Sequence, residues 1–171
     1  MKPSPRTQFF RFAMLALPFV GPAMAAETRL APPLEGTWTL AYADLLHADG
    51  RRDHDYGNAP KGLLQIDHAG HYSMLIFSTA RPKFAAGEKS LGTADEFRAA
   101  ALGTSSHFGT ISVDAVAHTL TLHIDGATYP NWEGTTQVRK YELDGDLLSY
   151  KVPPRANGDV PISGWKRLRG K

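Results

Sequence analysis

Apolar and polar residues alternate along several short stretches of the chain, and turn residues separate these stretches. In the run from His118 to Asp125, apolar residues occupy every second position, which is the period of a β-strand with one buried face. The same alternation flanks two tight turns, His68-Ala69-Gly70 and Asp144-Gly145, and predicts a hairpin at each. The pattern predicts about eight strands, at Gly36 to Ala43, Leu63 to Asp67, His71 to Ser78, His107 to Val113, His118 to Asp125, two within Gln137 to Val152, and Gly164 to Leu168.

One connection, from Arg81 to Thr104, is longer than a turn and contains a helix signal. Thr93 and Glu96 have the spacing of a capping box ahead of a run rich in alanine. Gly103 is placed to end this helix. The pattern therefore predicts one short helix between two strands.

The predicted elements indicate an all-β fold. A serial run of antiparallel strands has to protect its sheet edges, and closing the sheet into a barrel does so. We therefore predict an up-and-down antiparallel β-barrel of about eight strands with one short helix near one end. A β-sandwich is the alternative, because short alternating strands alone do not separate the two folds.

The order of the motifs resembles that of a known family. The opening strand, Leu34-Glu35-Gly36-Thr37-Trp38-Thr39-Leu40, carries a Gly-x-Trp similar to the first strand of lipocalins and related calycin barrels. From Leu34 to Arg167 the chain resembles the lipocalin-like domain family. The motifs that follow are YGNAPKGLLQIDHAGHYS, ARPKF, Asp95-Glu96-Phe97, HFGTISVD, YPNWEGTTQVRKYELDGDLL and Trp165-Lys166-Arg167.

The resemblance implies a calycin-type barrel with an internal cavity. It implies no reaction, because the family brings no agreed catalytic set to carry across. It also implies that Arg167 stacks over Trp38 at the closed end of the barrel, a cation–π contact of about 0.5–2 kcal/mol.

The first 25 residues have the features of a secretory signal peptide. Lys2, Arg6 and Arg11 precede an apolar stretch, and Ala23-Met24-Ala25 supplies the small residues of a cleavage site. We predict residues 1–25 as the signal peptide, 26–33 as an extended leader and 34–171 as the barrel domain. The mature protein is then expected in the periplasm or outside the cell.

Charge and cysteine content exclude several classes of partner. The signal peptide takes three of the nineteen basic residues and none of the seventeen acidic ones, so the formal charge of +2 becomes −1. Nucleic acid therefore has no support as a partner, and no later segment is apolar enough to be an integral membrane span. The absence of cysteine excludes thiol catalysis and disulfide frameworks. We expect a monomer.

One strand carries the clearest candidate for ligand binding. From Thr135 to Leu143, the period of two puts Gln137, Arg139 and Tyr141 on one face, while the opposite face carries two charges and is expected outside. A guanidinium inside a barrel needs an anionic or multiply accepting partner. Arg139 is therefore expected to bind a carboxylate or carbonyl of a ligand, or else to form a structural pair with a carboxylate of the barrel.

Two histidines are the candidates for acid–base chemistry, and the sequence names no full catalytic set. His107 shares a strand face with Ile111, so it is expected to point inward. His123 alternates with leucines and its orientation stays open, because a helix that covers one wall would reverse the facing of the strand. Two inward histidines beside Arg139 would make an acid–base pocket, and the alternative is a pair of hydrogen-bonded wall residues.

Aromatic and basic residues mark the expected rim of the barrel. The loop from Tyr129 to Gly134 contains Trp132, which either borders a ligand entrance or folds back as a plug. Arg81 begins the long connection and either guides an anionic ligand to the mouth or is simply solvated.

Metal and cofactor chemistry have little support. Asp67, His68 and His71 surround a hairpin turn, and Asp53-His54-Asp55 is a second cluster, but neither has the spacing of a zinc site. No serine-hydrolase elbow, P-loop or dinucleotide motif occurs. No metal and no cofactor are expected.

The sequence therefore supports an exported binding protein for one small hydrophobic or amphipathic molecule, held in the barrel by Arg139, Tyr141 and Gln137. One alternative is a cofactor-free isomerase, cyclase or hydratase acting on a hydrophobic substrate in the same cavity. The other is a filled barrel with a structural or interaction role, whose interior is occupied by Trp38, Phe77, Phe108, Tyr141 and Trp165. Binding without catalysis is preferred.

Overall fold

The computed structural model describes residues 34–169, so the predicted signal peptide at 1–25 and leader at 26–33 lie outside the described residues. All the predicted strands occur, and a two-residue strand, β2, is added to them. The strands are β1 (Gly36–Leu46), β2 (Arg52–Asp53), β3 (Lys61–Ile66), β4 (His71–Phe77), β5 (Thr104–Asp114), β6 (Thr119–Ala127), β7 (Thr136–Asp144), β8 (Leu147–Lys151) and β9 (Val160–Arg167).

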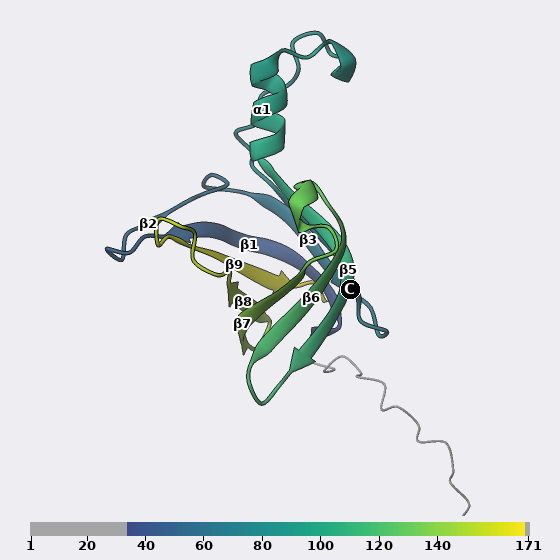
Figure 1. Ribbon diagram of the computed structural model, residues 1–171, viewed down its shortest axis with the longest axis vertical. Coiled ribbons are helices and arrows are strands. Elements are labelled where there is room, and N and C mark those ends of the chain that lie inside the picture. The colour runs from purple at the N-terminus through teal and green to yellow at the C-terminus, as the bar shows by residue number, and fades with distance from the viewer. Residues whose placement is uncertain (1–33, 170–171) are drawn as a thin grey trace, which may run out of the picture.

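The sheet closes on itself (Figure 1). Antiparallel pairing runs in chain order from β3 to β9, and β1 pairs with both β3 and β9. β2 pairs with the end of β1 alone and adds no strand to the ring. Eight strands therefore form a closed antiparallel barrel, as the pattern predicts, and the sandwich alternative is excluded.

Alternate residues of each strand point into the barrel, because successive side chains leave a strand on opposite faces. On β6, Leu120, Leu122 and Ile124 are buried, while His123 between them is exposed. Burying one such leucine or isoleucine side chain contributes about 1.5–3 kcal/mol. The same alternation supplies the rest of the core, which includes Leu64, Ile66, Tyr72, Met74, Ile76, Ile111, Leu148, Tyr150 and Trp165.

A cation–π contact covers the end of the barrel at which β1 begins. Arg167 Cζ lies 3.9 Å from the centroid of the Trp38 ring. Trp38 Nε1 donates to the carbonyl oxygen of Leu34 over 3.1 Å, and Arg167 donates to the carbonyl of Glu35. The expected stacking of Arg167 on Trp38 is confirmed, and we call this the closed end.

β1 contains a bulge that the sequence pattern did not predict. Leu40 and Tyr42 pair with successive residues of β9, so Ala41 is one residue extra. The bulge reverses the facing of the strand, since Trp38 is buried before it and Ala43 is buried after it. Tyr42 consequently lies on the outer face.

The four connections at 47–60, 78–103, 128–135 and 152–159 all lie at the other end of the barrel, because every strand of the ring is antiparallel to its neighbours. We call this end the mouth. The helix α1 (Ala94–Leu102) projects away from the barrel on the second of these connections (Figure 1).

The predicted capping box of α1 is present. Glu96 N donates to Thr93 Oγ1 over 3.2 Å, and Thr93 N donates to Glu96 Oε2 over 2.7 Å. Gly103 follows the last residue, as expected. None of the helix residues is buried, so α1 does not cover a wall of the barrel.

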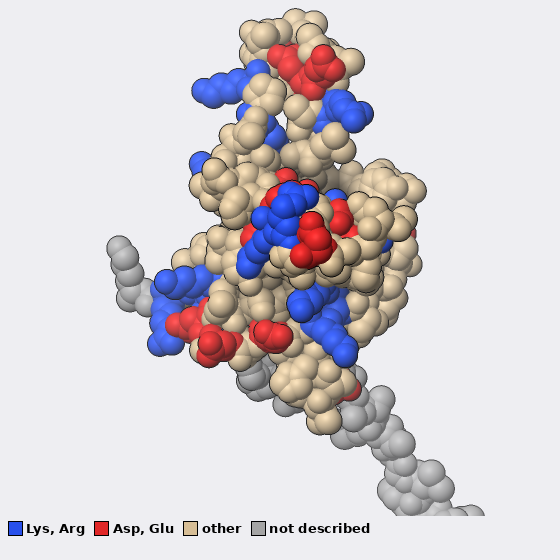
Figure 2. All heavy atoms as spheres, turned by 90° about the vertical axis from the view of Figure 1, so that its left-hand side faces the viewer, with Lys and Arg blue, Asp and Glu red and all other residues tan. Residues whose placement is uncertain are grey.

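Neither α1 nor any other helical segment within residues 34–169 has the length and apolar character to cross a membrane. On the face shown in Figure 2, basic and acidic side chains lie beside one another over the barrel. Charges of both signs therefore lie close together on this face.

Candidate functional site

The barrel interior contains a cluster of polar side chains. β7 positions Gln137, Arg139 and Tyr141 on its inner face, where Arg139 is only 5% exposed and Tyr141 is also buried. Arg139 Nη2 donates to Gln137 Oε1, two residues away on the same strand. From β8, the ring of Tyr150 lies 5.2 Å from Arg139 Cζ. Strand periodicity therefore places these three residues of β7 as predicted.

Arg139 is a buried cation without a buried anion beside it. Among residues 34–169, no carboxylate oxygen lies within 4.0 Å of its guanidinium nitrogens, and its Nε has no hydrogen-bond partner. Its contacts are therefore a neutral amide and an aromatic ring, which compensate a buried charge poorly. The alternative of a structural pair with a carboxylate is not found within the described residues.

Tyr72 on β4 and His107 on β5 extend the cluster across the barrel. The Tyr72 hydroxyl oxygen lies 2.7 Å from His107 Nδ1, and both residues are buried. Burial, and secondarily the charge of Arg139, lower the pKa of His107 to about 3. Burial raises the pKa of Tyr72. Both side chains are therefore neutral near pH 7.

An aromatic residue covers this cluster on the side of the mouth. Trp132 belongs to the 3-10 segment η3 (Pro130–Trp132), and its ring stands edge-on to His107 at a centroid distance of 5.9 Å. Tyr129 packs edge-on against Trp132 at a centroid distance of 5.5 Å and is 52% exposed. Of the two readings of Trp132 open at the level of sequence, the folded-back plug is the one seen here.

Tyr56 covers the interior from another connection at the mouth. It is packed against the core, and burial raises the pKa of its hydroxyl. Its neighbour Asp55 accepts a hydrogen bond from Arg155 Nη2 over 2.9 Å. The connection that carries Tyr56 is thereby tied to the connection between β8 and β9.

The interior is almost completely filled. The enclosed cavity measures about 10 Å³, which is room for about one water molecule. Tyr72, Met74, His107 and Tyr150 line it together with aliphatic side chains. The internal cavity that the resemblance implies is therefore almost closed in this structure.

Two of the five expected filling residues lie elsewhere. Trp38, Tyr141 and Trp165 are buried, in agreement with the filled-barrel alternative. Phe108 is 56% exposed on the outer face of β5, and Phe77 also faces outward, where Arg81 packs on its ring. The prediction for these two phenylalanines is wrong because each follows or precedes an inward residue on its strand.

Two other candidates lie outside the interior cluster. His123 is exposed on β6, and its Nδ1 contacts Thr136 Oγ1 at 2.9 Å on the outer face. Arg81 lies near the mouth but on the outside, where it contacts Thr104 Oγ1. The structure therefore gathers Gln137, Arg139, His107 and Trp132, while His123 and Arg81 are separate from them.

Tyr72 and Tyr150 belong to the site although the sequence analysis did not single them out. A usable signal was present, because the alternation on β4 puts Tyr72 on the same face as Met74 and Ile76. Tyr150 similarly shares the inner face of β8 with Leu148.

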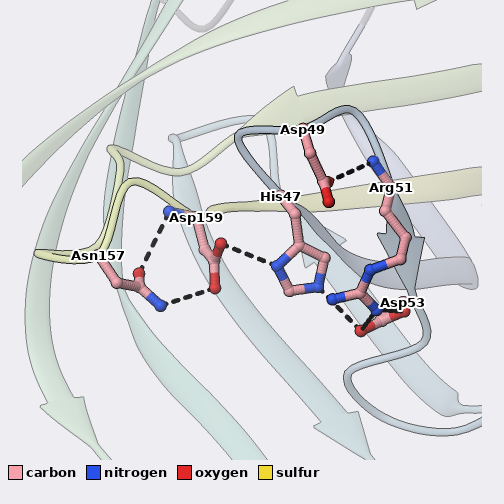
Figure 3. A network of polar contacts seen from close by, with 6 residues as sticks. All are labelled: His47, Asp49, Arg51, Asp53, Asn157 and Asp159. Carbon is pink, nitrogen blue, oxygen red and sulfur yellow. Dashed lines mark hydrogen bonds and ion pairs between the residues drawn. The ribbon is translucent and has the colours of Figure 1, made fainter.

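A second polar network joins three segments at the mouth (Figure 3). His47 Nδ1 lies 2.9 Å from Asp159 Oδ1, and His47 Nε2 lies 2.8 Å from Asp53 Oδ2. Asn157 Nδ2 donates to Asp159 Oδ2 over 2.7 Å, and Arg51 pairs with Asp53. Because carboxylates face both ring nitrogens, the hydrogen bonds with Asp53 and then Asp159 raise the pKa of His47.

The histidine clusters weighed as metal sites make local pairs instead. His71 Nδ1 lies 2.9 Å from Asp67, His68 Nδ1 lies 3.2 Å from Glu35, and His54 contacts Asp44. Within the part of the chain that the structure describes, no three His, Cys, Asp or Glu side chains converge as ligands for one ion.

The chain matches a known family, and it is similar to a solved structure. A family model described as a lipocalin-like domain matches residues 35–165. A solved structure of a lipocalin-like protein from Bacteroides uniformis ATCC 8492 is similar at 15% sequence identity and a TM-score of 0.43, over 80% of this chain and 99% of that chain. No curated protein matches the sequence.

Proposed function

The chain belongs to the lipocalin-like domain family, and we propose that it binds one small amphipathic molecule in the barrel interior, with Arg139 pairing with a carboxylate of that molecule. The uncompensated charge of Arg139 is the observation that carries the proposal. A buried guanidinium without a counter-charge costs stability. A ligand carboxylate supplies the missing charge and accepts from the free Nε at the same time.

The rest of the cluster suits the same ligand. Tyr72, Tyr150 and Gln137 add two hydroxyls and an amide to the cluster around Arg139, while the remainder of the interior is mainly apolar. The Tyr150 hydroxyl donates to Met74 Sδ, and its ring faces Arg139. A few convergent polar groups in an apolar interior are typical of small-molecule sites. The ligand accordingly has an apolar body and one anionic end.

Binding requires the mouth to open, because only about 10 Å³ of the interior is unfilled. Trp132 packs on His107 from one connection at the mouth, and Tyr56 packs against the core from another. A ligand that replaces these rings shifts the protein toward an open state by its higher affinity for that state. Binding is therefore slower than diffusion and limited by the opening.

The neutral state of His107 favours binding over acid–base catalysis. A general base works best with a pKa near the working pH, and the pKa of His107 is about 3. Its buried partner, Tyr72, has a raised pKa and is a weak acid near pH 7. The pair is suited to orient a ligand through hydrogen bonds.

We also propose that this binding takes place outside the cytoplasm, since residues 1–25 have the composition of a signal peptide. Expression of the full chain in a Gram-negative host tests this point. Mass spectrometry of the protein from the periplasmic fraction should give an N-terminus at Ala26, and an intact Met1 in the cytoplasm would contradict it.

A matched pair of ligands tests the binding proposal. Decanoate and decanol share an apolar chain and differ in the carboxylate, and Trp132 at the mouth provides a fluorescence signal. We expect saturable quenching by decanoate, with an affinity about 10–100-fold higher than that for decanol, as one charge-assisted hydrogen bond gives. Arg139→Met should remove the preference, and Arg139→Lys should keep part of it.

Lys140→Met is the matched control, because Lys140 is the next residue on β7 and points outward. It should leave the preference for decanoate unchanged. Equal binding of decanoate and decanol to the natural chain, or an equal effect of the two methionine variants, would contradict the proposal.

A further inference from the structure

A surface hollow near the mouth gathers three basic side chains and two hydroxyls. It has a volume of about 380 Å³, and it lies outside the barrel, apart from the interior cluster. Among residues 34–169, no acidic residue lines it. The lining residues are Lys61, Phe77, Ser78, Thr79, Arg81 and Lys83.

Arg81 is held in place at this hollow by three contacts. Its Nε donates to the carbonyl oxygen of Ser78 over 2.9 Å, and its Nη1 donates to Thr104 Oγ1 over 3.0 Å. Its Cζ lies 4.6 Å from the centroid of the Phe77 ring. The Nη2 donors have no partner among residues 34–169, so a fixed guanidinium presents free N–H groups.

The two lysines have no counter-charge. Within the described residues, no carboxylate lies within 4.0 Å of the ammonium group of Lys61 or of Lys83. The acidic residue Glu96 on α1 is bonded to the backbone of Thr93 and Ala85. Three like charges that face one hollow repel one another, and a bound anion relieves this repulsion.

We propose that this hollow binds a phosphate monoester group of a small soluble molecule. Arg81 provides planar N–H donors and the lysines provide point charges, a combination that suits phosphate oxygens. The Ser78 and Thr79 hydroxyls add two further donors. The volume exceeds that of a bare oxyanion, and the half-buried ring of Phe77 in the lining offers apolar surface to the organic part of the ester.

Amide chemical shifts of ¹⁵N-labelled protein test the site directly, in titrations with phenyl phosphate and with inorganic phosphate at constant ionic strength set by sodium chloride. We expect saturable shifts at Ser78, Thr79 and Arg81, and tighter binding of phenyl phosphate than of inorganic phosphate. The double variant Lys61→Gln/Lys83→Gln should weaken binding about tenfold or more.

The double variant Lys140→Gln/Lys151→Gln is the control, since it removes the same charge from the outer faces of β7 and β8. It should leave both affinities unchanged. Non-saturating shifts, or equal weakening by the two double variants, would overturn the site, and equal affinity for the two phosphates would overturn the ester as its ligand. Because the interior is not involved, the decanoate experiment can fail while this one succeeds.

Discussion

His47 and Asp159 are 112 positions apart in the sequence, yet a contact of 2.9 Å between His47 Nδ1 and Asp159 Oδ1 joins the end of β1 to the start of β9 at the mouth. Asp53 faces the other ring nitrogen at 2.8 Å. With a carboxylate on each side, the ring satisfies both contacts only when it carries two protons. The contact therefore depends on pH.

We expect the network to lose its contribution to stability at alkaline pH. The pKa of His47 in the folded chain is raised above its ordinary value of 6.5, so its contribution is complete below pH 6.5 and is lost as the pH rises through the raised value. Urea unfolding between pH 6 and pH 9 should show this loss in the natural chain and not in His47→Gln. His68→Gln, which removes an exposed histidine, should keep the natural profile.

Asp53 in the same network gives stability the opposite dependence on pH. Hydrogen bonds from His47 and Arg51 lower the pKa of Asp53 below its ordinary value of 3.8, so its contribution is present above pH 3.8 and is lost as the pH falls through the lowered value. The contributions of His47 and Asp53 are thus both complete between pH 3.8 and pH 6.5.

His107 should make the fold sensitive to acid. Its pKa is about 3 in the folded chain and 6.5 ordinarily, so the unfolded chain takes up a proton before the folded chain does. Stability from this residue is complete above pH 6.5 and falls toward pH 3, by at most about 1.4 kcal/mol per pH unit. His107→Gln keeps a hydrogen-bond partner for Tyr72, and it should make the free energy of unfolding depend less on pH between pH 3 and pH 6.5. If this dependence is the same as in the natural chain, the lowered pKa of His107 is contradicted.

Removing the Trp132 ring at the mouth should raise the pKa of His107. Trp132 stands edge-on to His107, so Trp132→Ala admits water to the ring and reduces the desolvation that lowers its pKa. An NMR titration of the His107 ring should show a pKa clearly above about 3. Tyr129→Ala is the control, because the Tyr129 ring contacts Trp132 and, within residues 34–169, is not among the rings that pack on His107; an equal shift in both variants would argue against direct screening by Trp132.

Arg139→Met should stabilise the protein. The substitution removes a buried charge without breaking an ion pair, and replacing even a paired buried charge and its partner by apolar groups of similar size is often neutral or gains about 1–4 kcal/mol. Part of this gain is lost because Gln137 no longer has its donor. Thermal unfolding should give a higher Tm for Arg139→Met and nearly the natural Tm for Lys140→Met. A clear loss of stability would show that Arg139 has a compensating partner.

Arg167→Met should destabilise the closed end. The stacking on Trp38 is worth about 0.5–2 kcal/mol, and the bond to the carbonyl of Glu35 adds about 1 kcal/mol more. Arg169→Met is the matched control, since Arg169 pairs with Asp146 at the surface and is mostly exposed. Its effect on urea unfolding should stay within about 0.5 kcal/mol.

Local patterns were sufficient to predict most of the barrel. Alternation on β7 identified the inward face that carries Arg139, and the Thr93–Glu96 spacing identified α1. The bulge at Ala41 was not predictable in this way, because one extra residue leaves no compositional mark yet reverses the facing of the rest of β1.

The parts of the site that could not be predicted depend on contacts between distant segments. His47 contacts both Asp53 and Asp159 only after β1 and β9 have paired, and no local sequence motif predicts the two contacts together. The filled interior depends on the summed packing of many side chains rather than on the type of any one of them. The folding back of Trp132 onto His107 likewise depends on the shape of the whole mouth.

Because β1 pairs with β9, the barrel cannot close until both strands have been synthesised. A polypeptide is synthesised from its N-terminus, so β1 is made well before its partner β9. Until β9 arrives, β1 has one unpaired edge, and contacts between such distant segments form slowly. The barrel therefore closes only after β9 has been synthesised, and until then the free edge of β1 is open to pairing with other chains.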